Sequence, residues 1–305
     1  MSFALAISPI AFAFVLGWAA KASGILKAEH WAGIEMLSFR LLIPAILIHA
    51  IASADLDPAK IGPLATALLT TVAVAGLAAL ALRLIWPRER VSNAALSTLF
   101  QTSTRWNAFI ALSAADLLGG PEVLLLIAVS MAVMIPMINI GNILVLAWLC
   151  SGSSSPTRIF RTIATNPLVI GCAIGLVLNA FPALQPEPLM AAFEIVGRAA
   201  LGVGLLVVGA GISLRRLSKF SAVVVAGTLI RPIAVPGVFF AIGSVIGLQA
   251  PELLAGLLVT AVPAASNGYV VAKAMGGDAD LYADILVWQT FLAMIAIPVY
   301  AMLVL

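Results

Sequence analysis

Two long apolar stretches of the chain are interrupted by polar side chains and helix-breaking residues. The stretch at 91–118 contains the run Gln-Thr-Ser-Thr-Arg-Trp-Asn, which includes Arg105 and ends at Asn107. The stretch at 252–275 contains the run Pro-Ala-Ala-Ser-Asn-Gly, which begins at Pro263. An arginine inside a membrane is costly and usually faces a partner or an aqueous path. Because a guanidinium can hold a carboxylate through two parallel hydrogen bonds, these runs predict a site for an organic anion.

Each interruption is expected to divide one membrane-spanning helix into two half-helices. Pro263 removes a backbone donor and clashes with the preceding turn, while Ser266 and Asn267 can accept from the free N–H groups of the next half-helix. Such breaks are tolerated in hydrocarbon only where protein or a wet cavity covers them. If the two breaks cross, N-terminal helix ends with partial positive charge gather near the midplane and favour a carboxylate. The alternative is that Pro263 only kinks its helix and that residues 101–107 are a loop end.

The candidate substrate-binding residues lie on these two breaks and early in the last apolar segment. They are Arg105, Asn107, Thr104, Pro263, Ser266, Asn267 and Gln289. Arg231, next to Pro232, is expected to hold loose backbone carbonyls.

Three further residues are candidates for coupling or proton transfer, namely Glu35, His49 and Lys273. Each has a structural alternative. Glu35 could form an intrahelical ion pair with Arg40, as Glu194 could with its neighbour at i,i+4. His49 could be a core histidine with its hydrogen bonds satisfied, and Lys273 could extend to the cytoplasmic surface.

The elements that position these residues are predicted from composition to lie in lipid. Hydrophobic residues make up 63% of the chain and charged residues 10%, against about 25% charge in soluble domains. The net charge of +3 gives no support for nucleic-acid binding. We find no cysteine-pair metal motif, no nucleophile with a matching base and no aspartate pair, so we expect neither an enzyme nor a cofactor, and leave proton coupling open.

A helix of about 20 apolar residues crosses a bilayer, which predicts an all-α integral membrane protein with ten spans. The spans are Ala4–Ala20, Ala32–Ala54, Ile61–Trp86, Val91–Leu118, Val123–Leu149, Pro167–Phe181, Leu189–Leu214, Phe220–Leu248, Glu252–Met275 and Leu281–Leu305.

Basic residues alternate along the connections between these spans. They concentrate after spans 1, 3, 5 and 7, as Lys21, Lys27, Arg88, Arg90, Arg158, Arg161, Arg215, Arg216 and Lys219. The positive-inside rule places these connections in the cytoplasm and both termini on the periplasmic side. The first apolar stretch has no basic segment before it and continues into further apolar stretches, so we interpret it as a span and not as a cleaved signal.

An odd number of spans in each half means that two such halves must be inverted relative to each other. The predicted units are a first five-helix repeat at 1–150, a cytoplasmic linker at 151–166 and a second, inverted repeat at 167–305. Spans 4 and 9 both end in a Gly-Gly pair, a weak similarity of the kind expected for inverted repeats.

Four segments carry a resemblance to a known family. They read LLIPAILIHAIASADL, RWNAFIALSAADLLGG, NPLVIGCAIGLVLNAF, and VPAASNGYVVAKAMGGDADL followed by VWQT. In their order and spacing the chain resembles the auxin efflux carrier family, which includes plant PIN proteins and bacterial malonate and malate carriers. The resemblance implies ten helices in inverted repeats, a crossover of spans 4 and 9, and a fold similar to that of sodium/proton antiporters and bile-acid transporters. It also implies export or exchange of mono- or dicarboxylates across a bacterial inner membrane.

Two positions carry family roles by resemblance. Asn107 matches the asparagine of the first crossover, and Pro263 matches the proline of the second. One departure is that Ala111-Leu112-Ser113 stands where many members have Gly-x-Pro, which weakens an indole acid as substrate. The short linker also lacks the long hydrophilic loop of the plant members.

Two alternatives to an organic-anion carrier remain. One is a sodium-coupled symporter of the bile-acid type, which is disfavoured because neither crossover contains an acid that could bind sodium. The other is a non-transporting membrane receptor. The expected partners are a small organic anion and the lipid bilayer, without nucleic acid, and a homodimer is left open.

Overall fold

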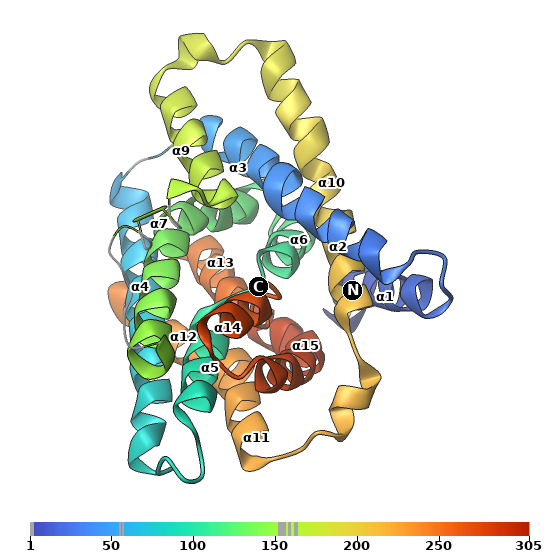
Figure 1. The fold of residues 1–305 in the computed structure, drawn as a ribbon. Coiled ribbons are helices and arrows are strands. Elements are labelled where there is room, and N and C mark those ends of the chain that lie inside the picture. The colour runs from blue at the N-terminus through green and yellow to red at the C-terminus, as the bar shows by residue number, and fades with distance from the viewer. Residues whose placement is uncertain are drawn as a thin grey trace.

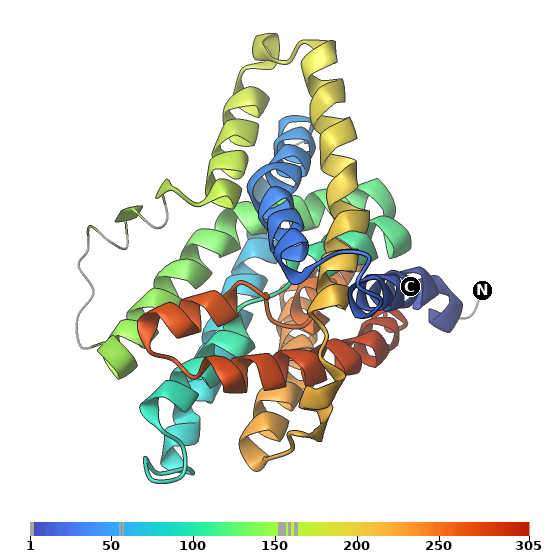
Figure 2. The same ribbon diagram turned by 45° about the vertical axis from the view of Figure 1, so that its right-hand side comes forward.

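The protein is described from a computed structural model covering residues 3–54, 56, 58–151, 157, 160–161 and 164–304. Within these ranges every regular element is a helix, as Figures 1 and 2 show. The all-α membrane class predicted from the sequence is confirmed. By length and composition, six helices are able to cross a membrane, and three more are apolar but shorter. The count of ten spans stays a prediction.

The helices of residues 3–151 are α1 (Phe3–Ala22), α2 (Ala28–Leu37), α3 (Ile43–Ala52), α4 (Pro58–Ala81), α5 (Asn93–Thr104), α6 (Ala108–Leu118) and α7 (Gly120–Leu146). Those of residues 167–301 are α9 (Pro167–Ala180), α10 (Glu187–Gly211), α11 (Ala222–Leu229), α12 (Val235–Ile246), α13 (Ala250–Ala261), α14 (Gly268–Met275) and α15 (Ala279–Ala301). The described residues also contain short turns of two other helix types. The π-helical turns are η1 (Ser38–Leu42), η3 (Ala147–Ser151) and η6 (Ile230–Ala234), and the 3₁₀ turns are η2 (Leu82–Leu84), η4 (Pro182–Leu184) and η5 (Leu214–Ser218).

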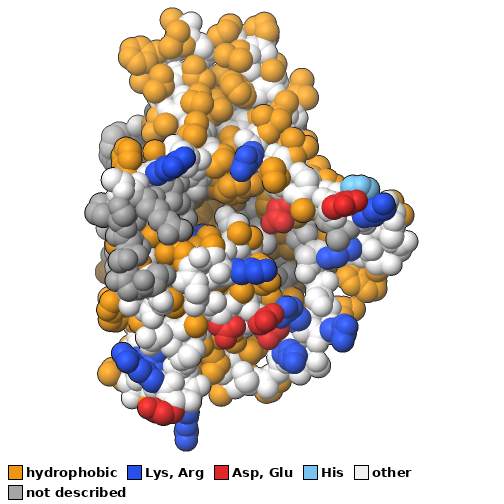
Figure 3. All heavy atoms as spheres, in the orientation of Figure 1, with side chains coloured by type: hydrophobic (Ala, Val, Ile, Leu, Met, Phe, Trp, Pro, Cys, Tyr) orange, Lys and Arg blue, Asp and Glu red, His pale blue; other side chains and the backbone are white. Residues whose placement is uncertain are grey.

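The helices pack as two groups. The first, which we call the outer group, contains α1 to α3 with η1, and α9 and α10. In it α1 lies along α10, and α3 packs against both α9 and α10. The second, the crossover group, contains α4 to α7 and α11 to α15. In Figures 1 and 2, α9 and α10 extend together past the rest of the molecule. Figure 3 shows that this extension is covered with apolar side chains, whereas charged side chains gather on the opposite part. Such an apolar exterior suits contact with lipid.

Glycines allow the outer group to pack closely. A Cβ added to Gly17 would lie 2.0 Å from the carbonyl oxygen of Leu206, and one added to Gly209 would lie 2.2 Å from that of Phe14. The two helix backbones are therefore in direct contact on both sides of the α1–α10 interface. Small residues at a helix interface are the usual means of packing helices in membranes, where lipid removes the hydrophobic drive for association.

Both interrupted segments are broken in the structure. The first separates into α5 and α6, with Arg105 extended at φ −73°, ψ 152°. The second separates into α13 and α14, with Val262 extended at φ −67°, ψ 153°. Neither simple kinking at Pro263 nor a loop end at 101–107 is observed. With 12 residues each, α5 and α13 are roughly 18 Å long, which is just over half of the hydrocarbon thickness.

Candidate functional site

The two breaks meet through their backbones. The amide of Asn107 donates to the carbonyl of Pro263 at 2.9 Å, and this bond joins the α5–α6 linker to the α13–α14 linker. The side chain of Asn107 also caps α6, because its Oδ1 accepts from the amide of Ile110 at 3.2 Å. Asparagine is among the preferred N-cap residues for this reason. The chain therefore forms a crossover of four half-helix ends.

Buried side chains satisfy the free backbone groups behind this crossover. Gln289 accepts from the amide of Ala264 at 2.9 Å and donates to the carbonyls of Thr102 at 3.1 Å and Gly227 at 2.8 Å. The hydroxyl of Tyr282 donates to Ala265 at 2.6 Å. These bonds matter because a backbone polar group left without a partner away from water costs as much as a lost hydrogen bond.

Arg231 donates hydrogen bonds to the free carbonyls at the ends of α5 and α13. Its Nη1 donates to the carbonyl of Ser103 at 3.0 Å, and its Nη2 and Nε donate to the carbonyls of Val259 at 2.7 Å and Val262 at 3.2 Å. The expectation that Arg231 holds loose carbonyls is confirmed.

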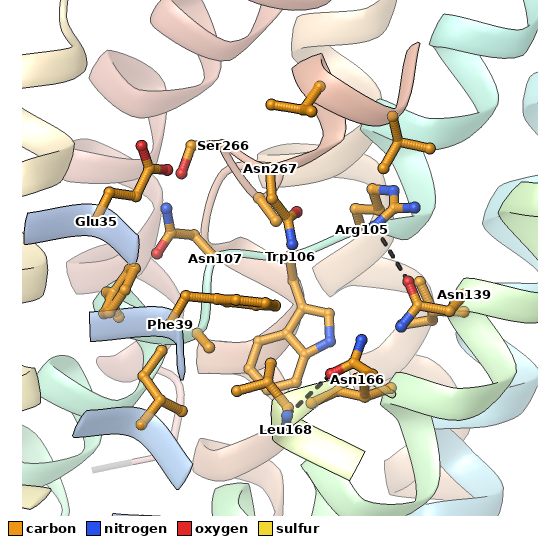
Figure 4. Close-up of a pocket in the computed structure, with 18 of the residues that line it drawn as sticks. Glu35, Phe39, Arg105, Trp106, Asn107, Asn139, Asn166, Leu168, Ser266 and Asn267 are labelled. Carbon is orange, nitrogen blue, oxygen red and sulfur yellow. Dashed lines mark hydrogen bonds between the residues drawn. The ribbon is translucent and has the colours of Figure 1, made fainter. Parts of the chain in front are cut away.

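A cavity of about 370 Å³ lies on the other side of the crossover. Its walls come from α2, η1 and the start of α9 in the outer group, and from α6, α7, α14 and both linkers in the crossover group. The polar side chains that line it are Glu35, Arg105, Asn107, Asn139, Asn166, Ser266 and Asn267, and the aromatic ones are Phe39, Trp106 and Phe109. Figure 4 shows most of these side chains around one space. The volume is in the range of small-molecule sites.

Arg105 is the cationic group of this cavity. The residue is only 4% exposed, and its guanidinium donates to Gln101 Oε1 and to Asn139 Oδ1, both at 3.3 Å. Figure 4 shows the second bond at one end of the space. Both acceptors are neutral, and no described carboxylate forms an ion pair with Arg105. Because a buried charge without a counterion is costly, this arginine is suited to receive an anion.

Glu35 lies across the cavity from Arg105. Figure 4 shows its carboxylate directed toward Ser266, with the amide of Asn107 nearby. The same three residues also border a smaller cavity of about 110 Å³ that extends to Arg216 and α15. The ion pair considered between Glu35 and Arg40 is absent from the described residues, whereas the pair between Glu194 and its i,i+4 neighbour forms at 2.8 Å. Glu35 is therefore free to face the cavity.

Comparison with known proteins gives a family match for the second part of the chain. Residues 156–301 match a family model described as membrane transport protein. This match, over just under half of the chain, supports the resemblance to the auxin efflux carrier family. No curated protein matches the chain. The matched residues include α9 to α15, and so contain Arg231, the second break and the residues of α14 that line the cavity.

The structure brings some of the sequence-based candidates to the cavity and places others elsewhere. Arg105, Asn107, Ser266, Asn267 and Glu35 line the cavity. The remaining candidates do not line the cavity; they are Thr104, Pro263, Gln289, His49 and Lys273.

Each of the remaining candidates has another environment. Thr104 accepts a hydrogen bond from Asn142 at 3.1 Å, and Pro263 and Gln289 are buried within the crossover. His49 Nε2 lies 3.9 Å from a carboxylate oxygen of Glu194 on α10, and Lys273 is exposed on α14.

Sequence reasoning missed Asn166, Trp106 and Phe39 as lining residues. Asn166 caps α9 through a bond from the amide of Leu168 at 2.9 Å, and its position just before a proline was a signal for a helix start. Asn139 on α7 is a further lining residue that the sequence analysis did not name. It accepts a hydrogen bond from Arg105.

Proposed function

We propose that the protein is a secondary active carrier of small organic anions, such as mono- or dicarboxylates, that works by alternating access around the crossover. The observation that carries this proposal is Arg105, a buried cation that faces a cavity between two helix groups and has no carboxylate partner among the described residues. The N-terminal end of α6, with its partial positive charge, lies beside it at Asn107. Apolar and aromatic walls would enclose the carbon skeleton of the anion.

The proposed architecture has ten spans in two inverted halves within a bacterial inner membrane, with periplasmic termini. Its support is that each half contributes one broken helix, and that the two breaks bond to each other between Asn107 and Pro263. Discontinuous helices at corresponding places of two repeats are typical of substrate sites in carriers.

We also propose that the cavity belongs to an inward-facing state. The lining residues Ala32 and Glu35 lie in α2, the helix that follows the connection carrying Lys21 and Lys27. Asn166 is the last residue of the linker, which is also basic. Since basic connections are cytoplasmic, the cavity would open to the cytoplasm. Because its walls come from both helix groups, rocking the outer group against the crossover group would close it on this side.

Replacement of Arg105 tests this function. Uptake of a radiolabelled dicarboxylate and of a monocarboxylate is measured in proteoliposomes containing wild-type protein or Arg105→Ala. A hydrogen bond to a charged group contributes about 1.5–3 kcal/mol, so we expect transport at low substrate concentration to fall by roughly 10- to 100-fold.

The matched control is Arg198→Ala, which removes an exposed arginine outside the cavity while leaving the site intact. Circular dichroism and gel filtration report whether both variants are folded. Wild-type rates in a folded Arg105→Ala variant would remove this residue from the mechanism and with it the proposed anion site.

A further inference from the structure

The helix ends behind the crossover have their own electrostatic requirement. The C-terminal end of an α-helix carries about half a negative charge, located on its last carbonyl groups. Here two such ends, those of α5 and α13, meet away from water. Their combined charge of about −1 needs a cation, because unpaired polar groups in a low-dielectric region are expensive.

Arg231 supplies this charge. The residue is fully buried at 0% exposure, and each of its three guanidinium nitrogens donates to one carbonyl, with Ser103 at the end of α5 and Val259 and Val262 at the end of α13. No described carboxylate forms an ion pair with it. One guanidinium therefore balances two helix ends, and the backbone carbonyls are its only counter-charges among the described residues.

The same group of carbonyls is suited to a metal cation. In carriers that couple transport to sodium, unwound backbone carbonyls and half-helix C-terminal ends coordinate the ion. In this protein the carbonyl oxygens of Ser103, Val259 and Val262 already accept hydrogen bonds from Arg231. The carbonyl of Thr102 accepts one from Gln289. A mobile ion would have to displace the guanidinium of Arg231, which is part of η6 and cannot leave the site.

We infer that Arg231 is a tethered cation that takes the place of a coupling ion, so that the crossover is assembled permanently and transport needs no sodium. This inference rests on the proposed carrier function. Arg231 acts through the crossover backbone and is a positioning residue, since it is not among the residues that line the cavity. It keeps the ends of α5 and α13 together, and thereby holds Arg105 and Asn107 at the cavity.

The first test is ion replacement. Wild-type protein in proteoliposomes should transport at equal rates when sodium is replaced by potassium or choline. Arg231→Ala should lose at least 10-fold in rate, and sodium or about 10 mM guanidinium, far below the molar range that denatures proteins, should restore much of this rate while choline does not. Sodium dependence of the wild type, or full activity of Arg231→Ala in choline, would overturn the inference.

The second test does not depend on transport. The melting temperature of purified Arg231→Ala should rise on addition of guanidinium or sodium but not of choline, because a ligand that binds only the folded state stabilises it. The wild type should show no such cation-specific rise. If Arg231→Ala does not fold, Arg231→Lys is measured in its place. A single ammonium leaves at least one of the three carbonyls without a donor, so a small cation can still bind there. A folded variant that no small cation stabilises would refute the tethered-cation role, even if the acids tested for transport are the wrong substrates.

Discussion

Replacing Asn107 by aspartate separates the charge of the site from its structure. Asn107→Asp is nearly isosteric, and the new carboxylate can still accept from the amide of Ile110, as Asn107 Oδ1 does at 3.2 Å. A negative charge at a helix N-terminus stabilises the helix by about 0.3–1 kcal/mol. We therefore expect the variant to fold, while the cavity next to Arg105 acquires a charge that repels an anion.

The size of this effect follows from Coulomb's law. An anion in the cavity would lie about 4–6 Å from the new carboxylate, and like charges at this separation repel by roughly 3–4 kcal/mol at an effective dielectric constant of 20. Binding of a monocarboxylate should weaken by on the order of 100- to 1,000-fold, since about 1.4 kcal/mol corresponds to a factor of ten. Because protonation of Asp removes its charge, the lost affinity should partly return as the pH falls.

The assay is isothermal titration or scintillation proximity binding of a labelled organic acid to purified protein between neutral and mildly acidic pH. Asn107→Ser is the matched control, because serine also caps a helix but adds no charge. It should retain most of the affinity and show no new pH dependence. Equal affinities for Asn107→Asp and wild type at neutral pH would show that the anion does not bind at the crossover.

Three further predictions concern the melting temperature and the rate of transport. Gly209→Val should lower the melting temperature in a thermal-shift assay by an amount equivalent to about 1–3 kcal/mol, because its side chain would meet the backbone of Phe14; an unchanged melting temperature would contradict the close α1–α10 packing. Tyr282→Phe removes the 2.6 Å bond to Ala265 and should cost about 1–3 kcal/mol by leaving a buried carbonyl without this donor, measured by the same assay; a neutral result would mean that water or a neighbour replaces the hydroxyl. Glu35→Gln removes a carboxylate that lines the cavity and would repel an anion, so uptake of a dicarboxylate into proteoliposomes should become faster at neutral pH; an unchanged rate would show that Glu35 does not face the bound anion.

The sequence was sufficient to locate the crossover, because its signals are local. A proline, an N-cap asparagine and a polar run inside an apolar stretch each act on the backbone within one or two turns. The positions of both breaks, and the use of Arg231 for loose carbonyls, followed from such signals. The chemical character of the cavity followed from Arg105, because few arrangements in lipid tolerate an arginine.

The composition of the cavity wall could not be obtained in this way. Whether Phe39 and Asn166 face the crossover depends on how the outer group packs against it, and that packing is determined by contacts between residues distant in sequence. Gln289 illustrates the opposite case. Its type suggested a place in the cavity, but its amide instead bonds to three backbone groups behind the crossover, where only the tertiary structure reveals a need for it.

The hydrogen bonds of Arg231 and Gln289 also limit how the molecule can move. They connect η6 and α15 to both broken helices at the point where those helices are least regular. Exchanging such bonds one by one would expose bare carbonyls to a medium with no water to replace them. The crossover should therefore move as a rigid body, and any bending during a transport cycle should be confined to the connections on either side of it.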